Sequence, residues 1–172
     1  MSLNNKPNIY SNFHSSFVDK ILYRKREEIV KILVDFLKDK NLNDILDIGT
    51  TEDTDSIASN YIVKNLKNFK LYKSISDQKI NSSFFIKKLQ KSITSDFSVD
   101  ELNDYKSDVV ISNATIEHVG NFENQVKMCQ NIINLSKKFA INKRFIYLKC
   151  LILNQHNLLN YISLLCFLAQ FS

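Results

Sequence analysis

The chain of 172 residues is poor in the residues that break regular structure, with only two glycines and one proline. This scarcity excludes collagen-like and linker-rich chains and argues against an all-β protein with many turns. The three cysteines, Cys129, Cys150 and Cys166, are odd in number and contain no C-x-x-C pair. Neither a disulfide framework nor a zinc site is therefore indicated, and a reducing compartment fits.

Two sequence signals of other protein classes are also missing. The polar residues 1–16 contain no apolar core of signal-peptide length, so we expect a cytoplasmic protein. The pattern G-x-G-x-x-G is absent because Thr50 and Thr51 follow Gly49, which disfavours a nicotinamide-dependent oxidoreductase. His14 and His156 are isolated, so no metal site is expected.

The composition is that of one folded domain. Apolar residues make up 44% and charged residues 24% of the chain, as in ordinary globular proteins, and the length allows one genuine core. The net charge of +5 comes from lysines that are mixed with acids along the chain, so no nucleic-acid partner is expected. The densest basic run, residues 23–26, is followed at once by two glutamates and is typical of a solvated helix face.

Hydrophobic periodicity predicts alternating strands and helices. After a flexible arm at residues 1–16, apolar residues at three-and-four spacing predict a helix to about residue 39. The most strongly apolar strands are residues 44–50 and 107–113. The other expected elements are a helix capped by Thr54 or Asp55, a half-buried strand at 69–75, a short helix or irregular crossing at 84–89, a brief strand at 92–94, a helix at 99–105 capped by Ser98, a helix at 123–137 and a strand at 139–141.

This alternation predicts the fold class. Strand–helix–strand units with right-handed crossovers build an α/β domain with a doubly wound, mostly parallel, Rossmann-like sheet and helices on both faces. We expect the domain to occupy residues 17–144.

Two polar turns follow the two best strands. Asp47 and Gly49 end the first strand, and Asn113 ends the later one. Open α/β sheets bind their ligands at the carboxyl ends of strands, and a glycine there lets the backbone approach a ligand closely. The two turns therefore predict a crevice for a nucleoside-containing ligand.

Two motifs carry a resemblance to a known family. Residues 44–49 read D-I-L-D-I-G, and residues 108–119 read D-V-V-I-S-N-A-T-I-E-H-V. In this order they resemble the class I S-adenosylmethionine-dependent methyltransferases, over roughly residues 24–142. The resemblance implies S-adenosyl-L-methionine as cofactor and a small molecule as methyl acceptor.

The resemblance also implies which residues bind the cofactor. The turn at Asp47, Gly49 and Thr50 would hold its methionine part, and the end of the next strand, near Asp77, its ribose. Further positions are the adenine turn at Thr94 and the sulfonium-facing strand end at Asn113, Ala114 and Glu117.

His118 is the candidate catalytic residue. Its free pKa near neutrality would allow it to deprotonate a substrate hydroxyl or amine. The structural alternative, which we prefer, is that Glu117 satisfies free amides at a helix start while His118 lines the cofactor pocket.

The last segment differs from the rest. Residues 145–172 contain a single charged residue, Lys149, and no family pattern. We hypothesise that the methyltransferase sequence is truncated or frame-shifted after Arg144, which would leave the sheet incomplete at its C-terminal end and the chain inactive. A polar interruption at residues 154–157 disfavours a membrane span.

The sequence thus favours a methyltransferase. The alternative is a non-catalytic binding or membrane-associated protein that uses the apolar segment, with residues 158–169 as the membrane contact.

Overall fold

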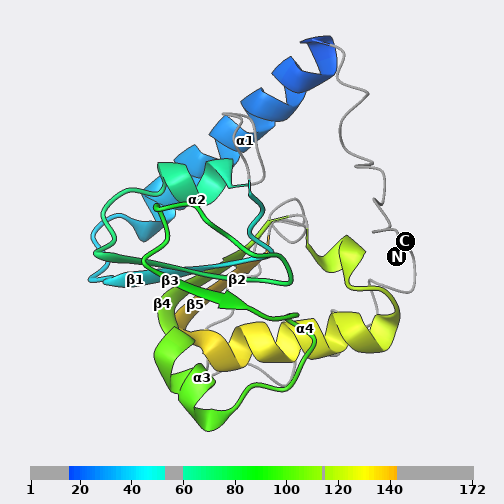
Figure 1. Cartoon of the computed structure of the whole chain (residues 1–172). Coiled ribbons are helices and arrows are strands. Elements are labelled where there is room, and N and C mark those ends of the chain that lie inside the picture. The colour runs from blue at the N-terminus through cyan, green and yellow to red at the C-terminus, as the bar shows by residue number, and fades with distance from the viewer. Residues whose placement is uncertain (1–15, 53–59, 114, 143–172) are drawn as a thin grey trace.

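The computed structural model describes residues 16–52, 60–113 and 115–142. The expected arm before residue 16, the caps at Thr54 or Asp55, the residue Ala114 and the apolar segment after residue 144 lie outside these ranges. The chain begins with a long helix, α1 (Ser16–Leu37), and reaches the first strand, β1 (Asp44–Ile48), after a short connection. Figure 1 shows this helix lying on one side of the sheet.

The remaining elements alternate as the sequence predicts. They are α2 (Tyr61–Asn65), β2 (Leu71–Ser76), β3 (Lys87–Gln90), α3 (Val99–Tyr105), β4 (Ser107–Ser112), the 3-10 turn η1 (Ile116–His118), α4 (Phe122–Leu135) and β5 (Ser136–Asn142). The α3 helix has the bounds expected from sequence because Ser98 and Glu101 form a reciprocal capping box with its first amides.

The five strands form one sheet in the order β3-β2-β1-β4-β5, and every neighbouring pair is parallel. The α/β, Rossmann-like fold class expected from sequence is therefore confirmed. All residues of the central strands β1 and β4 are buried, as expected for parallel strands covered on both faces.

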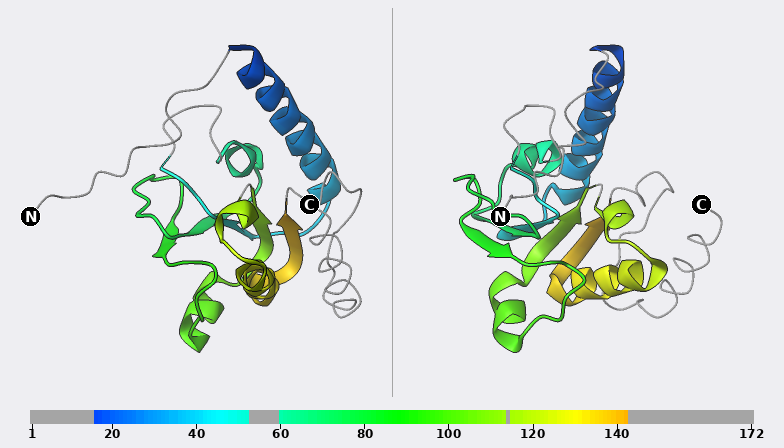
Figure 2. Two further views of the ribbon diagram at one scale, coloured as in Figure 1. Left: turned by 90° about the vertical axis from the view of Figure 1, so that its right-hand side faces the viewer. Right: turned by 45° about the vertical axis from the view of Figure 1, so that its right-hand side comes forward.

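Helices cover both faces of the sheet (Figure 2). On one face, Ile29 and Leu33 of α1 and Val63 of α2 join a core with Ile45 and Val109. On the other face, Met128 and Ile132 of α4 pack with Leu46, Ile48 and Val110. Because side chains alternate along a strand, each central strand contributes apolar residues to both cores.

The third strand corrects two expectations. Residues 84–89 were expected to be helical or irregular, yet β3 begins at Lys87, and residues 92–94 form a turn instead of a strand. The β3 strand lies at the sheet edge and is mostly exposed, so it lacks the apolar pattern of a strand. Its backbone pairing with β2, from Lys73 with Lys87 to Ser76 with Gln90, decides its conformation.

Two other elements also differ from the expectation. The last helix ends at Leu135, two residues earlier than expected, because Ser136 is already extended and pairs with Ser107 as the start of β5. The β2 strand was expected to be half-buried, but its last four residues are all buried. One of these four is Lys73, which is only 4% exposed.

Lys73 is buried because it meets Asp44 at the amino ends of the strands. Its Nζ lies 2.8 Å from Asp44 Oδ2 and 2.9 Å from the carbonyl oxygen of Lys106. The Asp108 amide donates to Asp44 Oδ1 at 2.9 Å, and Lys137 Nζ lies 3.3 Å from Asp44 Oδ2. The Asp44 carboxylate thus contacts groups from three other strands.

The pKa of Asp44 is below its ordinary value of 3.8. Burial alone would raise this pKa, but hydrogen bonds from Lys73 and from the Asp108 amide outweigh that effect. Because the folded-state pKa is depressed, the contribution of Asp44 to stability is present at neutral pH. It is lost as the pH falls below 3.8 and through the lower folded-state pKa.

We expect Asp44→Asn to lower the free energy of unfolding by about 3 kcal/mol at neutral pH, because it leaves the Lys73 ammonium buried without a countercharge. Urea unfolding followed by circular dichroism measures this change. The control is Lys25→Gln, which breaks an exposed pair with Glu28 and should cost about 0.5 kcal/mol or less. Equal effects of the two substitutions would contradict the role of Asp44, and the difference between wild type and Asp44→Asn should shrink in acid.

Candidate functional site

The strand order places a switch point between β1 and β4. The chain proceeds from β1 outward to β2 and β3, then returns to the other side of β1 to form β4 and β5. In open α/β sheets, ligands bind at such a point, beyond the carboxyl ends of the strands. Ile48 pairs with Ser112, so the turns that begin at Gly49 and Asn113 are neighbours there.

The turn after β1 is fixed by hydrogen bonds within the protein. The Thr50 hydroxyl donates to Asp47 Oδ2 at 2.7 Å, and both residues are buried. The Gly49 amide donates to the carbonyl oxygen of Ile75 at 2.9 Å, and the Ser76 hydroxyl donates to the carbonyl oxygen of Thr50 at 2.7 Å. The predicted residues Asp47, Gly49 and Thr50 therefore form one rigid turn tied to the end of β2.

Gly49 contacts the turn that follows β4. It has a φ of +80°, and a Cβ added to it would overlap Thr115 Oγ1 and lie 2.8 Å from Thr115 Cβ. The Thr115 hydroxyl donates to the carbonyl oxygen of Ile48 at 3.0 Å, so its side chain crosses from the β4 turn to the end of β1. A glycine is required here both by the backbone angle and by this contact, which joins the two predicted motifs.

The turn after β4 differs in detail from the expectation. Asn113 is buried, whereas Glu117 and His118 are exposed. Both exposed residues lie in the 3-10 turn η1, and the helix α4 begins later, with Asn121 as its N-cap at 3.0 Å from the Asn124 amide. The expectation that Glu117 satisfies the amides of a helix start is therefore wrong, because Asn121 does so.

The predicted ribose residue lies after β2. Asp77 is exposed, and its carbonyl oxygen accepts a 3.4 Å hydrogen bond from Gln90 Nε2 at the end of β3. The next connection also returns to the first turn, since the Asn81 amide donates to Glu52 Oε2 at 2.6 Å. The exposed carboxylate of Asp77 thus lies at the same sheet edge as the turn at Gly49.

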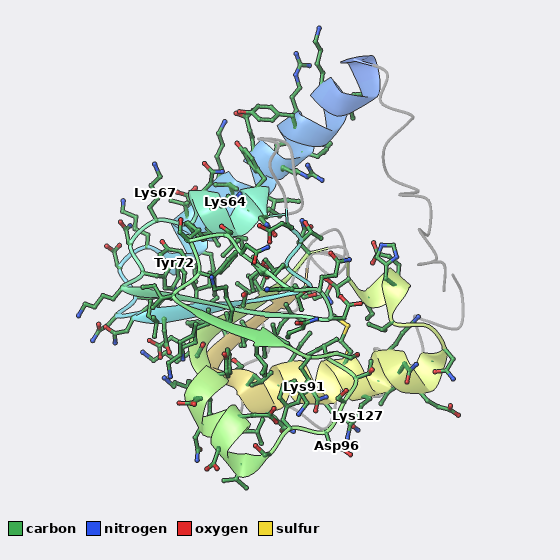
Figure 3. All side chains as sticks on the ribbon, in the orientation of Figure 1. Lys64, Lys67, Tyr72, Lys91, Asp96 and Lys127 are labelled. Carbon is green, nitrogen blue, oxygen red and sulfur yellow. The ribbon has the colours of Figure 1, made fainter. Side chains whose placement is uncertain are left out.

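The predicted adenine turn around Thr94 is anchored to α4. Asn131 is buried and its Nδ2 donates to the carbonyl oxygens of Ile93 at 2.6 Å and Ser95 at 2.9 Å. Lys127 Nζ lies 2.5 Å from Asp96 Oδ1, and this hydrogen bond lowers the pKa of Asp96. Figure 3 shows Asp96 and Lys127 beside α4. The turn around Thr94 is therefore held in place by contacts from α4.

An apolar layer supports all four turns. Ile93, Ile116 and Ile75 share one core cluster with Ile48, so the segments after β1, β2, β3 and β4 rest on common packing. Two residues that organise this edge, Thr115 and Asn131, are not among those predicted from sequence. Thr115 lies inside a recognised motif, but only the fold reveals that its partner is Gly49.

Charges are segregated between the two edges of the sheet. The carboxyl edge carries five acids, Asp47, Glu52, Asp77, Asp96 and Glu117, and three lysines, Lys79, Lys91 and Lys127, while the amino edge carries most of the lysines that precede the strands. An acidic edge attracts a cationic ligand. Within the described residues, no group of three or more His, Cys, Asp or Glu side chains is arranged to hold a metal ion. No helix in the described ranges is long and apolar enough to cross a membrane.

Comparisons with known proteins give a structural likeness and no match in sequence. No family model matches the chain, and no curated protein does. A crystal structure of the plantazolicin methyltransferase BpumL, in complex with a triazolic desmethylPZN analog and SAH, matches with a TM-score of 0.45 and 17% identity. The match covers 73% of this chain and 49% of that one, so this chain spans about half the length of that protein. A likeness at this level does not identify a function.

The contact between the two motifs predicts the cost of altering Gly49. We expect Gly49→Ala to lower the free energy of unfolding by about 3 kcal/mol, from backbone strain together with the clash against Thr115. In Gly49→Ala/Thr115→Ala, two of the three clashing atoms are gone while Thr115 Cβ remains. The double variant should therefore be less destabilised than the sum of the single variants.

Gly120→Ala is the matched control. Gly120 has a φ of +96°, but an added Cβ would approach nothing closer than Asn124 Nδ2 at 3.3 Å. We expect a loss of about 1 kcal/mol from backbone strain alone. Urea denaturation of all four variants gives the comparison, and additive effects of the Gly49 and Thr115 substitutions would refute the contact.

Proposed function

We propose that the chain is an S-adenosylmethionine-dependent methyltransferase that acts on a small molecule. The observation that carries this proposal is the switch point between β1 and β4. There, the turn at Gly49 and the turn at Asn113 lie side by side and contact each other through Thr115. These are the two segments whose sequences resemble the class I methyltransferases.

The charge of the carboxyl edge supports this ligand. S-adenosylmethionine carries a positive sulfonium, and the described acids at this edge outnumber the lysines by five to three. Opposite charges raise the local concentration of a ligand and strengthen its binding. A dinucleotide with two phosphates would meet repulsion at the same edge.

The residues fit the parts of this cofactor in the order of the strands. The turn at Asp47 and Thr50 would face the methionine part, and the exposed Asp77 carboxylate would accept hydrogen bonds from the ribose hydroxyls. The anchored turn at Thr94 would face the adenine. Asn113, together with the neighbouring positions Ala114 and Glu117, would face the sulfonium.

The protein's chemical task in this reaction is mainly positioning. When bound, the cofactor supplies an activated methyl group on its sulfonium, which is transferred as the nucleophile bonds to the methyl carbon and the carbon–sulfur bond breaks. A rigid edge that aligns the acceptor with this methyl group supplies the largest rate gain. His118 is exposed on η1 at this edge. Because Asn121 and not Glu117 caps the following helix, we now favour the catalytic role of His118 over the structural one and assign it to take the acceptor's proton.

Calorimetric titration with S-adenosylhomocysteine tests the proposal, with NAD as the competing ligand. We expect S-adenosylhomocysteine to bind and NAD to give no heat. Asp77→Asn should weaken binding by about tenfold, because a charged acceptor of the ribose hydroxyls becomes neutral. Failure of the wild-type chain to bind S-adenosylhomocysteine would defeat the proposed function.

Asp100→Asn is the control for the charge change, because Asp100 is exposed on α3. It should leave the affinity unchanged. If wild type binds but Asp77→Asn and Asp100→Asn behave alike, the assignment of Asp77 is wrong while the cofactor assignment stands.

A further inference from the structure

The amino edge of the sheet concentrates positive charge. All strands are parallel, so the residues that precede or begin β1, β2, β4 and β5 lie at one edge, opposite the proposed cofactor site. Eight lysines and four aspartates lie there, which leaves four positive charges in excess. They are Lys38, Lys40, Lys67, Lys70, Lys73, Lys106, Lys137 and Lys138, with Asp39, Asp44, Asp104 and Asp108. We call this surface the amino-edge face.

Most lysines of the amino-edge face are exposed to solvent, although aspartates lie at the same edge. Six of the lysines are exposed, and only Lys73 is buried, in its pair with Asp44. The two remaining ion pairs are loose, with Lys137 at 3.3 Å from Asp44 and Lys138 at 3.5 Å from Asp108. Figure 3 shows Lys67 on the outside of the molecule near the end of α2. The face therefore carries a net charge of +4 from these twelve residues.

A cavity lined by both apolar and polar residues opens in the same face. It has a volume of about 250 Å³ and lies between the end of α1 and the connection from α2 to β2. Its walls include Leu37, Leu42, Leu66 and Phe69. The polar residues that line it are Lys38, Lys67, Asn68 and a single acid, Asp39, and its apolar residue Val34 is 44% exposed.

These features favour one of two anionic partners, a nucleic acid or a lipid bilayer. Nucleic-acid binding favours arginines and exposed aromatic rings on which bases can stack, but all basic residues of the amino-edge face are lysines. Of its rings, Phe36 packs edge-on against Phe139 and is covered by Lys40 at 4.4 Å, and Phe69 packs edge-on against Tyr72. A lipid bilayer offers both the negative surface charge that attracts lysines and apolar groups that suit the cavity.

We propose that the amino-edge face docks on an anionic membrane surface, with the lysines over the lipid headgroups and the cavity around Val34 facing the acyl layer. This docking would leave the carboxyl edge, with the proposed cofactor site, facing away from the membrane. Docking in this way does not depend on the proposed function, because it uses the opposite edge of the sheet.

Vesicle co-sedimentation of the full chain tests the proposal. We expect binding to phosphatidylcholine vesicles that contain phosphatidylserine, no binding to phosphatidylcholine alone, and weaker binding at high salt. Lys67→Glu/Lys70→Glu should reduce the partition coefficient by roughly a hundredfold or more, since each lysine near an anionic surface contributes several-fold.

The control Lys20→Glu/Lys31→Glu changes the net charge equally at exposed positions of α1 and should retain most of the binding. Val34→Asp tests the cavity and should lower vesicle binding about tenfold, by adding a negative charge at an apolar wall. Circular dichroism and urea unfolding verify that each variant folds. S-adenosylhomocysteine titration of Lys67→Glu/Lys70→Glu should match wild type, which separates this inference from the proposed function.

Four outcomes would overturn the proposal. They are absence of phosphatidylserine-dependent binding, equal losses in the two double variants, an unaffected Val34→Asp variant, and preferential binding to duplex RNA over the anionic vesicles.

Discussion

The sheet depends on the buried carboxylate of Asp44. This carboxylate, at the first residue of the central strand, accepts hydrogen bonds from Lys73 in β2 and from the Asp108 amide in β4, and it attracts Lys137 in β5. Neighbouring strands with the same apolar pattern could pair in more than one register. A charged group that must find its partners makes other registers costly, because an unpaired ion inside the protein is strongly unfavourable.

The register fixed at the amino edge determines what meets at the carboxyl edge. Because β1 and β4 are aligned from Ile45 with Val109 to Ile48 with Ser112, Gly49 lies where the Thr115 side chain can reach the carbonyl oxygen of Ile48. The two polar turns become one unit, supported from below by an isoleucine layer and by Asn131. A ligand at this switch point would meet groups that are already in place, which reduces the entropy lost on binding.

The two edges of the sheet differ in charge because of where lysines and acids lie along the sequence. The segments that enter the strands are rich in lysine. The described segments that leave the strands carry more acids than lysines. A parallel sheet brings all entries to one edge and all exits to the other, so a modest bias along the sequence becomes a separation of charge in space.

Local sequence patterns are enough to predict several elements of the fold. The apolar runs of β1 and β4, the periodic α1 and the capping box of α3 are specified by residues close in sequence, and so is the presence of two polar turns after the best strands. The edge strand β3 was missed because its exposed lysines carry no strand pattern, and β2 was expected to be half-buried because Lys73 has the character of a surface residue.

The sequence by itself therefore determined the α/β class and the pair of turns at the candidate site, since both follow from hydrophobic periodicity and local turn chemistry. Only the tertiary structure decided that Gly49 faces Thr115, that Lys73 is buried against Asp44, and that the lysines gather at one edge. The first two contacts join residues more than 25 positions apart, and the third feature brings together segments from four strands. All three depend on strand order and register, which no local pattern encodes.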